Sequence, residues 1–255
     1  MIDSHCHLAD KKFSADLSAV IERARHAGVD RMVCIADSLR EGEECLKIAQ
    51  QYEYIFCTIG VHPHCASGWD EHSAEQLERM VHASPKVVAI GEIGLDYHYM
   101  RSPNDVQQKV FREQLQIAKS LQKAAVVHCR DAIADVRAIL KGVDPPKVVI
   151  HCCTEQWRDV EQIVQEGHFL SFTGIATFPT STDIRETIKN CPIDQLMIET
   201  DSPYLAPVPY RGKRNEPAYV VEVAKCMAEV KGMSLEEVGR ITTENAKRFF
   251  GLPDS

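Results

Sequence analysis

The chain lacks the features that mark membrane-spanning, secreted and zinc-thiolate proteins. None of its apolar runs approaches the ~20 residues of a membrane span. Residues 1–10 lack the basic start and apolar core of a signal peptide. The ten cysteines include no Cys-x-x-Cys pair, and many lie in apolar runs, where a reduced cysteine acts as a small hydrophobe. We therefore expect a soluble, cytoplasmic protein with no membrane partner.

Positive charge is in the minority, with 29 lysines and arginines against 37 aspartates and glutamates and a net charge of −8. An acidic protein does not attract polyanions through its overall field. If the substrate is a nucleic acid, the attraction must be local, from bound cations and a few basic loops.

Short runs rich in valine and isoleucine recur along the 255 residues, with helix-like stretches between them. The runs are almost continuously apolar, as parallel strands covered on both faces are. An apolar stripe over residues 106–121 predicts a helix, and the spacings Ser73–Gln76 and Ser234–Glu237 predict capping boxes. We predict eight strands, at residues 1–3, 31–36, 55–61, 87–91, 124–129, 147–152, 169–172 and 196–201.

Eight strands that alternate with helices predict a parallel α/β fold. A chain of about 250 residues is typical of a closed TIM-type (β/α)8 barrel. No Gly-x-Gly-x-x-Gly follows a predicted strand, and no linker or low-complexity segment divides the chain. We therefore predict one barrel domain over residues 1–255 rather than an open, doubly wound sheet.

Side chains able to bind metal lie where the predicted strands end, and in a barrel those ends meet at one mouth. Histidines and carboxylates among apolar residues incur a desolvation cost unless they are paired or bound to metal. Six such residues exceed the three protein ligands of a single catalytic zinc and suit two ions about 3.5–4 Å apart. We predict that His5, His7 and Asp201 hold one ion, that His128 and His151 hold the other, and that Glu92 bridges them.

Several segments of the sequence resemble motifs of the TatD-type metal-dependent deoxyribonucleases. They are DSHCHL, GVHPH, GEIGLDY, HCRDA, HC-x-T and ETDSPYLAP, with PVPYRGKRNEPAYV beyond them. The resemblance covers nearly the whole chain and implies a barrel hydrolase with divalent ions that cuts phosphodiester bonds in DNA, in several relatives from a 3′ end. The family's ligands map onto the same six residues. The chain departs from the family at Cys153, Glu155 and Tyr210, where relatives often carry Phe, Gly and His.

The predicted chemistry is hydrolysis by a metal-activated water. Metal binding lowers the pKa of water towards about 7. Asp201 is the candidate to orient the water and accept its proton, and with Glu92 it is a predicted catalytic residue. Two divalent ions are the predicted cofactors, as Zn²⁺, Mn²⁺ or Mg²⁺.

Other residues near the strand ends receive supporting roles. Arg130 could pair with a phosphate or with a neighbouring loop, and the charge run near residue 213 could contact DNA or only solvent. The predicted substrate contacts are His62, Arg130, Tyr204, Arg211, Lys213 and Arg214. Asp3, Glu199 and His64 are predicted to support the ligands from behind. Glu199 could equally be a buried hydrogen-bonded carboxylate or a further ligand.

The preferred function is that of a monomeric 3′–5′ exodeoxyribonuclease, with single-stranded DNA or 3′ ends as substrate. The alternative is a metal-dependent deacylase or amidohydrolase acting on a carbonyl substrate such as an aminoacyl-RNA ester. A metal-bound hydroxide can attack either phosphorus or a carbonyl carbon, and the fold does not decide between the two substrates. A metal-binding barrel without catalysis is disfavoured, because the ligand sets leave positions open to water.

Overall fold

The computed structural model describes residues 1–254, and Ser255 lies outside them. The chain divides into two compact units, one of Met1–Cys34 with the residues from Cys152 onward and one of Ile35–His151. The prediction of one domain over residues 1–255 stays a prediction. No helix among residues 1–254 is long and apolar enough to cross a membrane.

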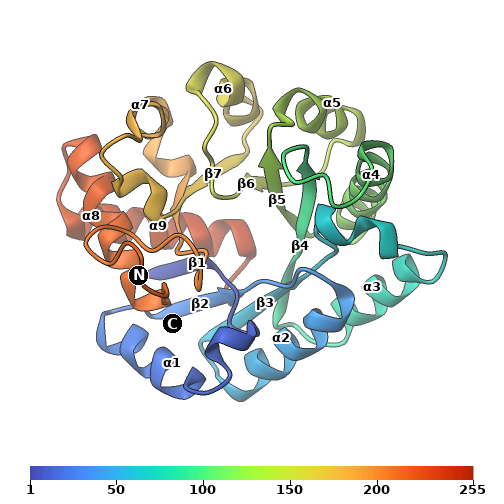
Figure 1. The fold of residues 1–255 in the computed structure, drawn as a ribbon, viewed down its shortest axis with the longest axis horizontal. Helices are drawn as coiled ribbons and strands as arrows, with labels where there is room; N and C mark the ends of the chain where they lie inside the picture. Colours follow the sequence, from blue (N-terminus) through green and yellow to red (C-terminus); the bar gives the residue numbers. More distant parts are fainter. Residues whose placement is uncertain (255) are drawn as a thin grey trace. The chain divides into compact units, whose positions relative to one another are not determined.

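The first unit alternates strands with helices (Figure 1). Its strands are β1 (Ile2–Cys6), β2 (Arg31–Cys34), β7 (Phe169–Phe172) and β8 (Leu196–Ile198). Its helices are α1 (Leu17–His26), α6 (Trp157–Gln165), α7 (Thr182–Asn190), α8 (Val220–Lys231) and α9 (Leu235–Phe250). Short 3-10 helices are η1 (Lys11–Phe13), η3 (Gly174–Thr177), η4 (Ile193–Gln195) and η5 (Pro217–Tyr219).

The second unit repeats the same alternation. Its strands are β3 (Ile55–Ile59), β4 (Val87–Asp96), β5 (Ala124–Arg130) and β6 (Val148–Ile150). Its helices are α2 (Leu39–Gln51), α3 (Ser73–His82), α4 (Asn104–Ser120) and α5 (Ile133–Val143), with the 3-10 helix η2 (Pro63–Gly68) after β3. In Figure 1, α2 lies beside β3 and α4 beside β4, the pairs that pack together.

The eight strands form one sheet in chain order, and each pairing we describe is parallel. An open sheet in this order would place β1 and β8 at opposite edges. Instead, a parallel bridge joins Cys6 at the end of β1 to Ser202 just after β8. The predicted TIM-type (β/α)8 fold is therefore confirmed.

All eight predicted strands are present, because nearly every residue in them is buried and most are apolar. The largest difference is at β4, which continues beyond residue 91 to Asp96 and is buried along its whole length. Glu92 consequently lies inside the strand rather than at its end, and Asp96 takes the terminal position.

One of the two predicted capping boxes is confirmed. Ser234 caps α9 by accepting from the Glu237 N–H, and Glu237 returns a bond to the Ser234 N–H. The box at Ser73 is wrong, since Ser73 is already the first residue of α3. Its hydroxyl donates instead to the Asp70 carboxylate at 2.8 Å, so that aspartate organises the start of the helix.

Candidate metal centre

The first cluster of potential ligands joins β1 to the segment after β8. His5 Nε2 lies 3.2 Å from His7 Nε2. Asp201 Oδ1 lies 3.6 Å from His5 Nε2 and 3.2 Å from His7 Nε2. His5 is fully buried, whereas the Asp201 side chain is 15% exposed. Three donor atoms thus converge on one point that solvent can reach beside Asp201.

Backbone hydrogen bonds fix the two segments that carry this cluster. The Asp201 N–H donates to the His5 carbonyl at 2.9 Å, and the His7 N–H donates to the Ser202 carbonyl at 2.8 Å. Asp201 has a left-handed backbone with φ 55°. The two segments therefore hold each other in place, and the three side chains are organised before a metal ion binds.

The spacing of the donor atoms suits a metal ion. Bonds of about 2.0–2.1 Å in a tetrahedral zinc site place neighbouring ligand atoms about 3.3 Å apart. The three separations in the first cluster, 3.2, 3.2 and 3.6 Å, bracket that value. Two imidazoles and one carboxylate also leave a coordination position for water, as catalytic zinc sites do.

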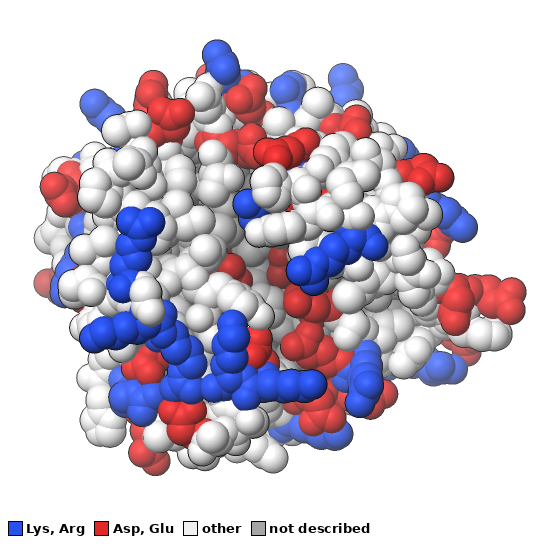
Figure 2. Space-filling model, in the orientation of Figure 1, with Lys and Arg blue, Asp and Glu red and all other residues white. Residues whose placement is uncertain are grey.

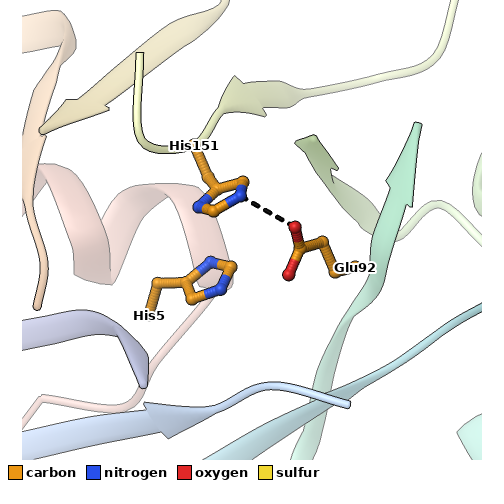
Figure 3. A group of neighbouring side chains, drawn as sticks. All are labelled: His5, Glu92 and His151. Carbon is orange, nitrogen blue, oxygen red and sulfur yellow. Dashed lines mark ion pairs between the residues drawn. The ribbon is translucent and has the colours of Figure 1, made fainter. Parts of the chain in front are cut away.

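The second cluster lies within the other unit, around Glu92 on β4. Glu92 Oε1 lies 2.8 Å from His151 Nε2, an ion pair drawn in Figure 3, and 2.9 Å from His128 Nδ1. The two imidazole nitrogens are 3.4 Å apart. His62 Nε2 lies 3.4 Å from the same carboxylate oxygen. These separations also suit ligands of one ion.

The electrostatics keep Glu92 ionised. Burial alone would raise the pKa of Glu92, but the charges of His151 and His62 and hydrogen bonds from His128 and His151 hold it well below its usual value. His128 shows the converse. Burial opposes its charge, yet hydrogen bonds with Asp96 and Glu92 raise its pKa. The cluster therefore attracts positive charge, whether from protons or from a cation.

Asp96 is a site residue that the sequence analysis missed. It is fully buried at the end of β4, and its Oδ2 lies 3.2 Å from His128 Nε2 and 2.9 Å from His64 Nε2. Burial is outweighed by these bonds and by the Tyr99 N–H, so the pKa of Asp96 is lowered. A carboxylate behind an imidazole ligand orients the ring. The signal was its place four residues after Glu92, within the motif GEIGLDY.

His62 and His64 both lie beside the second cluster. His62 is buried, with its ring centroid 4.6 Å from that of His128, so it lies within the second cluster, and the substrate contact predicted for it stays a prediction. Its Nδ1 accepts the His64 N–H at 3.1 Å. His64 contacts Asp96, which in turn contacts His128, and the supporting role of His64 stays a prediction.

Asp3 and Glu199 support the ligands through the backbone. Asp3 accepts bonds from the Thr200 N–H at 2.9 Å and the Thr200 hydroxyl at 2.6 Å, next to Asp201. Its bond to His5 reaches the backbone N–H at 3.4 Å, not the imidazole that we expected it to orient. Glu199 accepts from the Cys152 N–H, just after His151, and from the Ser171 hydroxyl, both at 2.6 Å.

Replacing Asp3 with alanine should destabilise the protein. Burial raises the pKa of Asp3 to about 8 against the bonds from Thr200, and its removal leaves those two donors without their acceptor. Each buried donor left unpaired costs about 1–3 kcal/mol. Urea unfolding of the metal-free protein should show a loss of about 2 kcal/mol or more. Asp3→Asn keeps one acceptor and should lose less, and equal losses for the two variants would contradict this role.

The predicted substrate residues of the first unit divide into two groups. Figure 2 shows lysines and arginines gathered over the loop after β8 and the segment after β1. Arg214 is already engaged, since its guanidinium makes two bonds to Asp16, at 2.8 and 2.7 Å. Arg211 and Lys213 are exposed, and Arg211 lies over the Phe178 ring. Of these three basic residues, Arg211 and Lys213 form no ion pair within residues 1–254 that would compete with a phosphate.

Tyr204 and Arg130 stand beside the two clusters. Tyr204 is 43% exposed, its ring lies 6.0 Å edge-on from the His7 ring, and its hydroxyl donates to Asp10. Arg130 is exposed at the end of β5, two residues after His128, and its guanidinium lies over the Tyr99 ring. Each can reach a substrate without occupying a ligand position.

Comparisons with known proteins agree with this geometry. A sequence model of the family described as TatD related DNase matches residues 2–251. The chain is 41% identical over 254 residues to the "uncharacterized metal-dependent hydrolase YabD" of Bacillus subtilis, covering 99% of each chain. It is 35% identical over 260 residues to the "3'-5' ssDNA/RNA exonuclease TatD" of Pectobacterium parmentieri, covering 99% of this chain and all of that one.

A solved structure shares the fold. The crystal structure of YJJV, a TatD homologue from Escherichia coli, superposes with a TM-score of 0.94 at 29% identity. The match covers 99% of this chain and 98% of the other. Family, fold and ligand geometry therefore lead to the same class of metal-dependent hydrolase.

Proposed function

Because this chain belongs to the TatD-related DNase family of metal-dependent hydrolases, we propose that it hydrolyses phosphodiester bonds of single-stranded DNA from the 3′ end with two divalent ions. The observation that carries the proposal is the pair of ligand clusters, each with imidazole nitrogens around a carboxylate oxygen. One ion is assigned to His5, His7 and Asp201, and the other to His128 and His151.

Glu92 is assigned as the carboxylate that the two ions share. In (β/α)8 barrels the active site is built at the carboxyl ends of the strands. The first cluster lies at the end of β1 and after β8, and the second lies inside β4, near the end of β5 and just after β6. Two-metal hydrolases hold their ions about 3.5–4 Å apart, a distance that one carboxylate can span.

Asp201 is the proposed general base. Bound divalent ions supply a water of lowered pKa and neutralise charge on the phosphate. Asp201 has the most exposed carboxylate in these clusters, at 15% against 4% for Glu92. It can therefore hydrogen-bond the attacking water and take its proton. The imidazoles hold the donor geometry, and Asp96 fixes the His128 ring from behind.

We propose DNA as the substrate because this acidic chain has a local group of basic residues that can attract a polyanion. Its net charge is −8, yet lysines and arginines gather over the loop after β8 and the segment after β1 (Figure 2). The name of the Pectobacterium relative is that of an exonuclease for single-stranded DNA and RNA. We propose contacts to phosphate for Arg211, Lys213 and Arg130, and stacking or phosphate contact for Tyr204. We also propose that the protein acts as a single-domain monomer in the cytoplasm.

Parallel assays with and without metal test this function. The chelator-treated protein should be inactive, and Zn²⁺, Mn²⁺ or Mg²⁺ should restore cleavage of 5′-labelled single-stranded DNA to a ladder that shortens from the 3′ end. Single-stranded RNA, aminoacyl-RNA and simple esters serve as competing substrates. Faster turnover of the aminoacyl ester than of DNA would replace the nuclease with the deacylase alternative, and activity that is unaffected by chelation would refute both.

A further inference from the structure

An exposed aromatic residue, Tyr99, stands in the segment that follows β4. Tyr99 is 51% exposed. The backbone beneath it is firmly held, because buried Asp96 Oδ1 accepts the Tyr99 N–H at 2.8 Å and the His98 N–H at 3.0 Å. The ring is therefore presented to solvent from a fixed base.

Basic and aromatic groups surround the Tyr99 ring. The guanidinium carbon of Arg130 lies 4.8 Å from the ring centroid, and that of Arg101 lies 5.8 Å from it. The His64 and His98 rings meet it edge-on, at 5.5 and 4.9 Å. A cation that lies over the face of an aromatic ring is attracted to that ring electrostatically.

Neither guanidinium is neutralised by an ion pair among residues 1–254. Asp131, next to Arg130 in the chain, pairs instead with His98 Nδ1 at 3.1 Å. Arg101 and Arg130 are both exposed. Two unpaired positive charges beside an exposed ring are suited to an anionic ligand that carries a flat group.

The group formed by Tyr99, Arg101 and Arg130 is linked to the second cluster through Asp96. The carboxylate that holds the Tyr99 backbone also contacts His128 Nε2. Arg130 follows His128 by two residues on β5, so the two side chains leave the same side of that strand. A substrate whose phosphate reaches the second cluster would extend over Tyr99.

We propose that Tyr99, Arg101 and Arg130 bind the nucleotide next to the phosphate being cleaved. The base stacks on the Tyr99 ring, and the guanidinium groups hold the phosphate that flanks it. The inference rests on the proposed nuclease function and adds a contact for one base. Stacking is tolerant of sequence because every base has a π-face, so the contact favours single-stranded nucleic acid over a particular base.

Binding of a single-stranded oligonucleotide that contains 2-aminopurine tests the contact without metal. In excess chelator, the wild-type protein and Tyr99→Phe should quench the fluorescence of the probe, because both rings stack. Tyr99→Ala should lose the quenching and bind about tenfold more weakly, within the range for one stacked base. Tyr54 lies just before the first residue of β3, away from the strand ends that carry the clusters. Tyr54→Ala is therefore the matched control and should behave as wild type.

Kinetics of the metal-loaded protein give the second readout. Tyr99→Ala should raise KM for single-stranded DNA about tenfold and change kcat less, and Tyr99→Phe should restore KM. Circular dichroism confirms that each variant folds. Equal binding, quenching and KM for Tyr99→Ala and wild type would overturn the inference. Probe binding through Tyr99 by a protein that cleaves no DNA with any metal would overturn the nuclease and support the nucleotide contact.

Discussion

Replacing Asp201 with asparagine is expected to lower kcat on single-stranded DNA by about 10²–10⁴-fold, the contribution of a general base in the transition state. The substitution also removes the negative charge 3.2 Å from His7 Nε2, which weakens the first ion site. Asparagine is the informative replacement because Asp201 has φ 55°, and asparagine adopts this left-handed conformation with little strain.

The rate should be compared with that of Asp144→Asn, which alters another aspartate with a left-handed backbone, φ 56°, at the end of α5. Both variants should keep the circular dichroism spectrum and unfolding midpoint of the wild type, while only Asp201→Asn loses activity. A turnover number for Asp201→Asn within a few-fold of wild type would remove Asp201 from the reaction.

Replacing Glu92 with glutamine is expected to abolish both tight metal binding and turnover. The Glu92 carboxylate faces His62, His128 and His151, and its lowered pKa keeps it ionised. Glutamine preserves the shape but removes the negative charge that faces the three imidazoles and would bind a cation. Removing a residue that only hydrogen-bonds a metal ligand lowers metal affinity about 10–100-fold. Removing a ligand itself should therefore lower the affinity by more than about 100-fold.

Calorimetric titration of metal-free protein with Zn²⁺ or Mn²⁺ measures this effect. Wild type should bind two ions per chain, and Glu92→Gln should bind fewer and more weakly, with no detectable DNA cleavage. Glu53→Gln, an exposed glutamate just before β3, should match the wild type. Unaltered stoichiometry and affinity in Glu92→Gln would show that this carboxylate holds no metal.

The sequence predicts most of the fold because the strands are buried apolar runs, and it predicts the ligands because histidines and acids interrupt those runs. It misjudges β4 because Gly91 and Gly94 resemble the end of a strand. Gly94 instead allows close packing, since a Cβ there would lie 2.0 Å from the His128 carbonyl oxygen. The extended strand carries Asp96 to the site, which a strand ending at residue 91 could not reveal.

Contacts between distant residues limit the prediction of substrate residues. Arg211, Lys213 and Arg214 form one basic run in the sequence, but of these three only Arg214 pairs with Asp16, far earlier in the chain. The pairing depends on how the loop after β8 folds back on the segment after β1. Likewise, Asp3 lies in the alternation pattern of His5, yet Thr200 takes its carboxylate because β8 is the neighbour of β1.

Anomalous diffraction from a crystal soaked with Mn²⁺ tests the central claim most directly. The account predicts two peaks in each molecule, one bounded by His5, His7 and Asp201 and one by His128 and His151, with Glu92 in contact with both ions. A molecule that binds Mn²⁺ only through other side chains, or not at all, would contradict it.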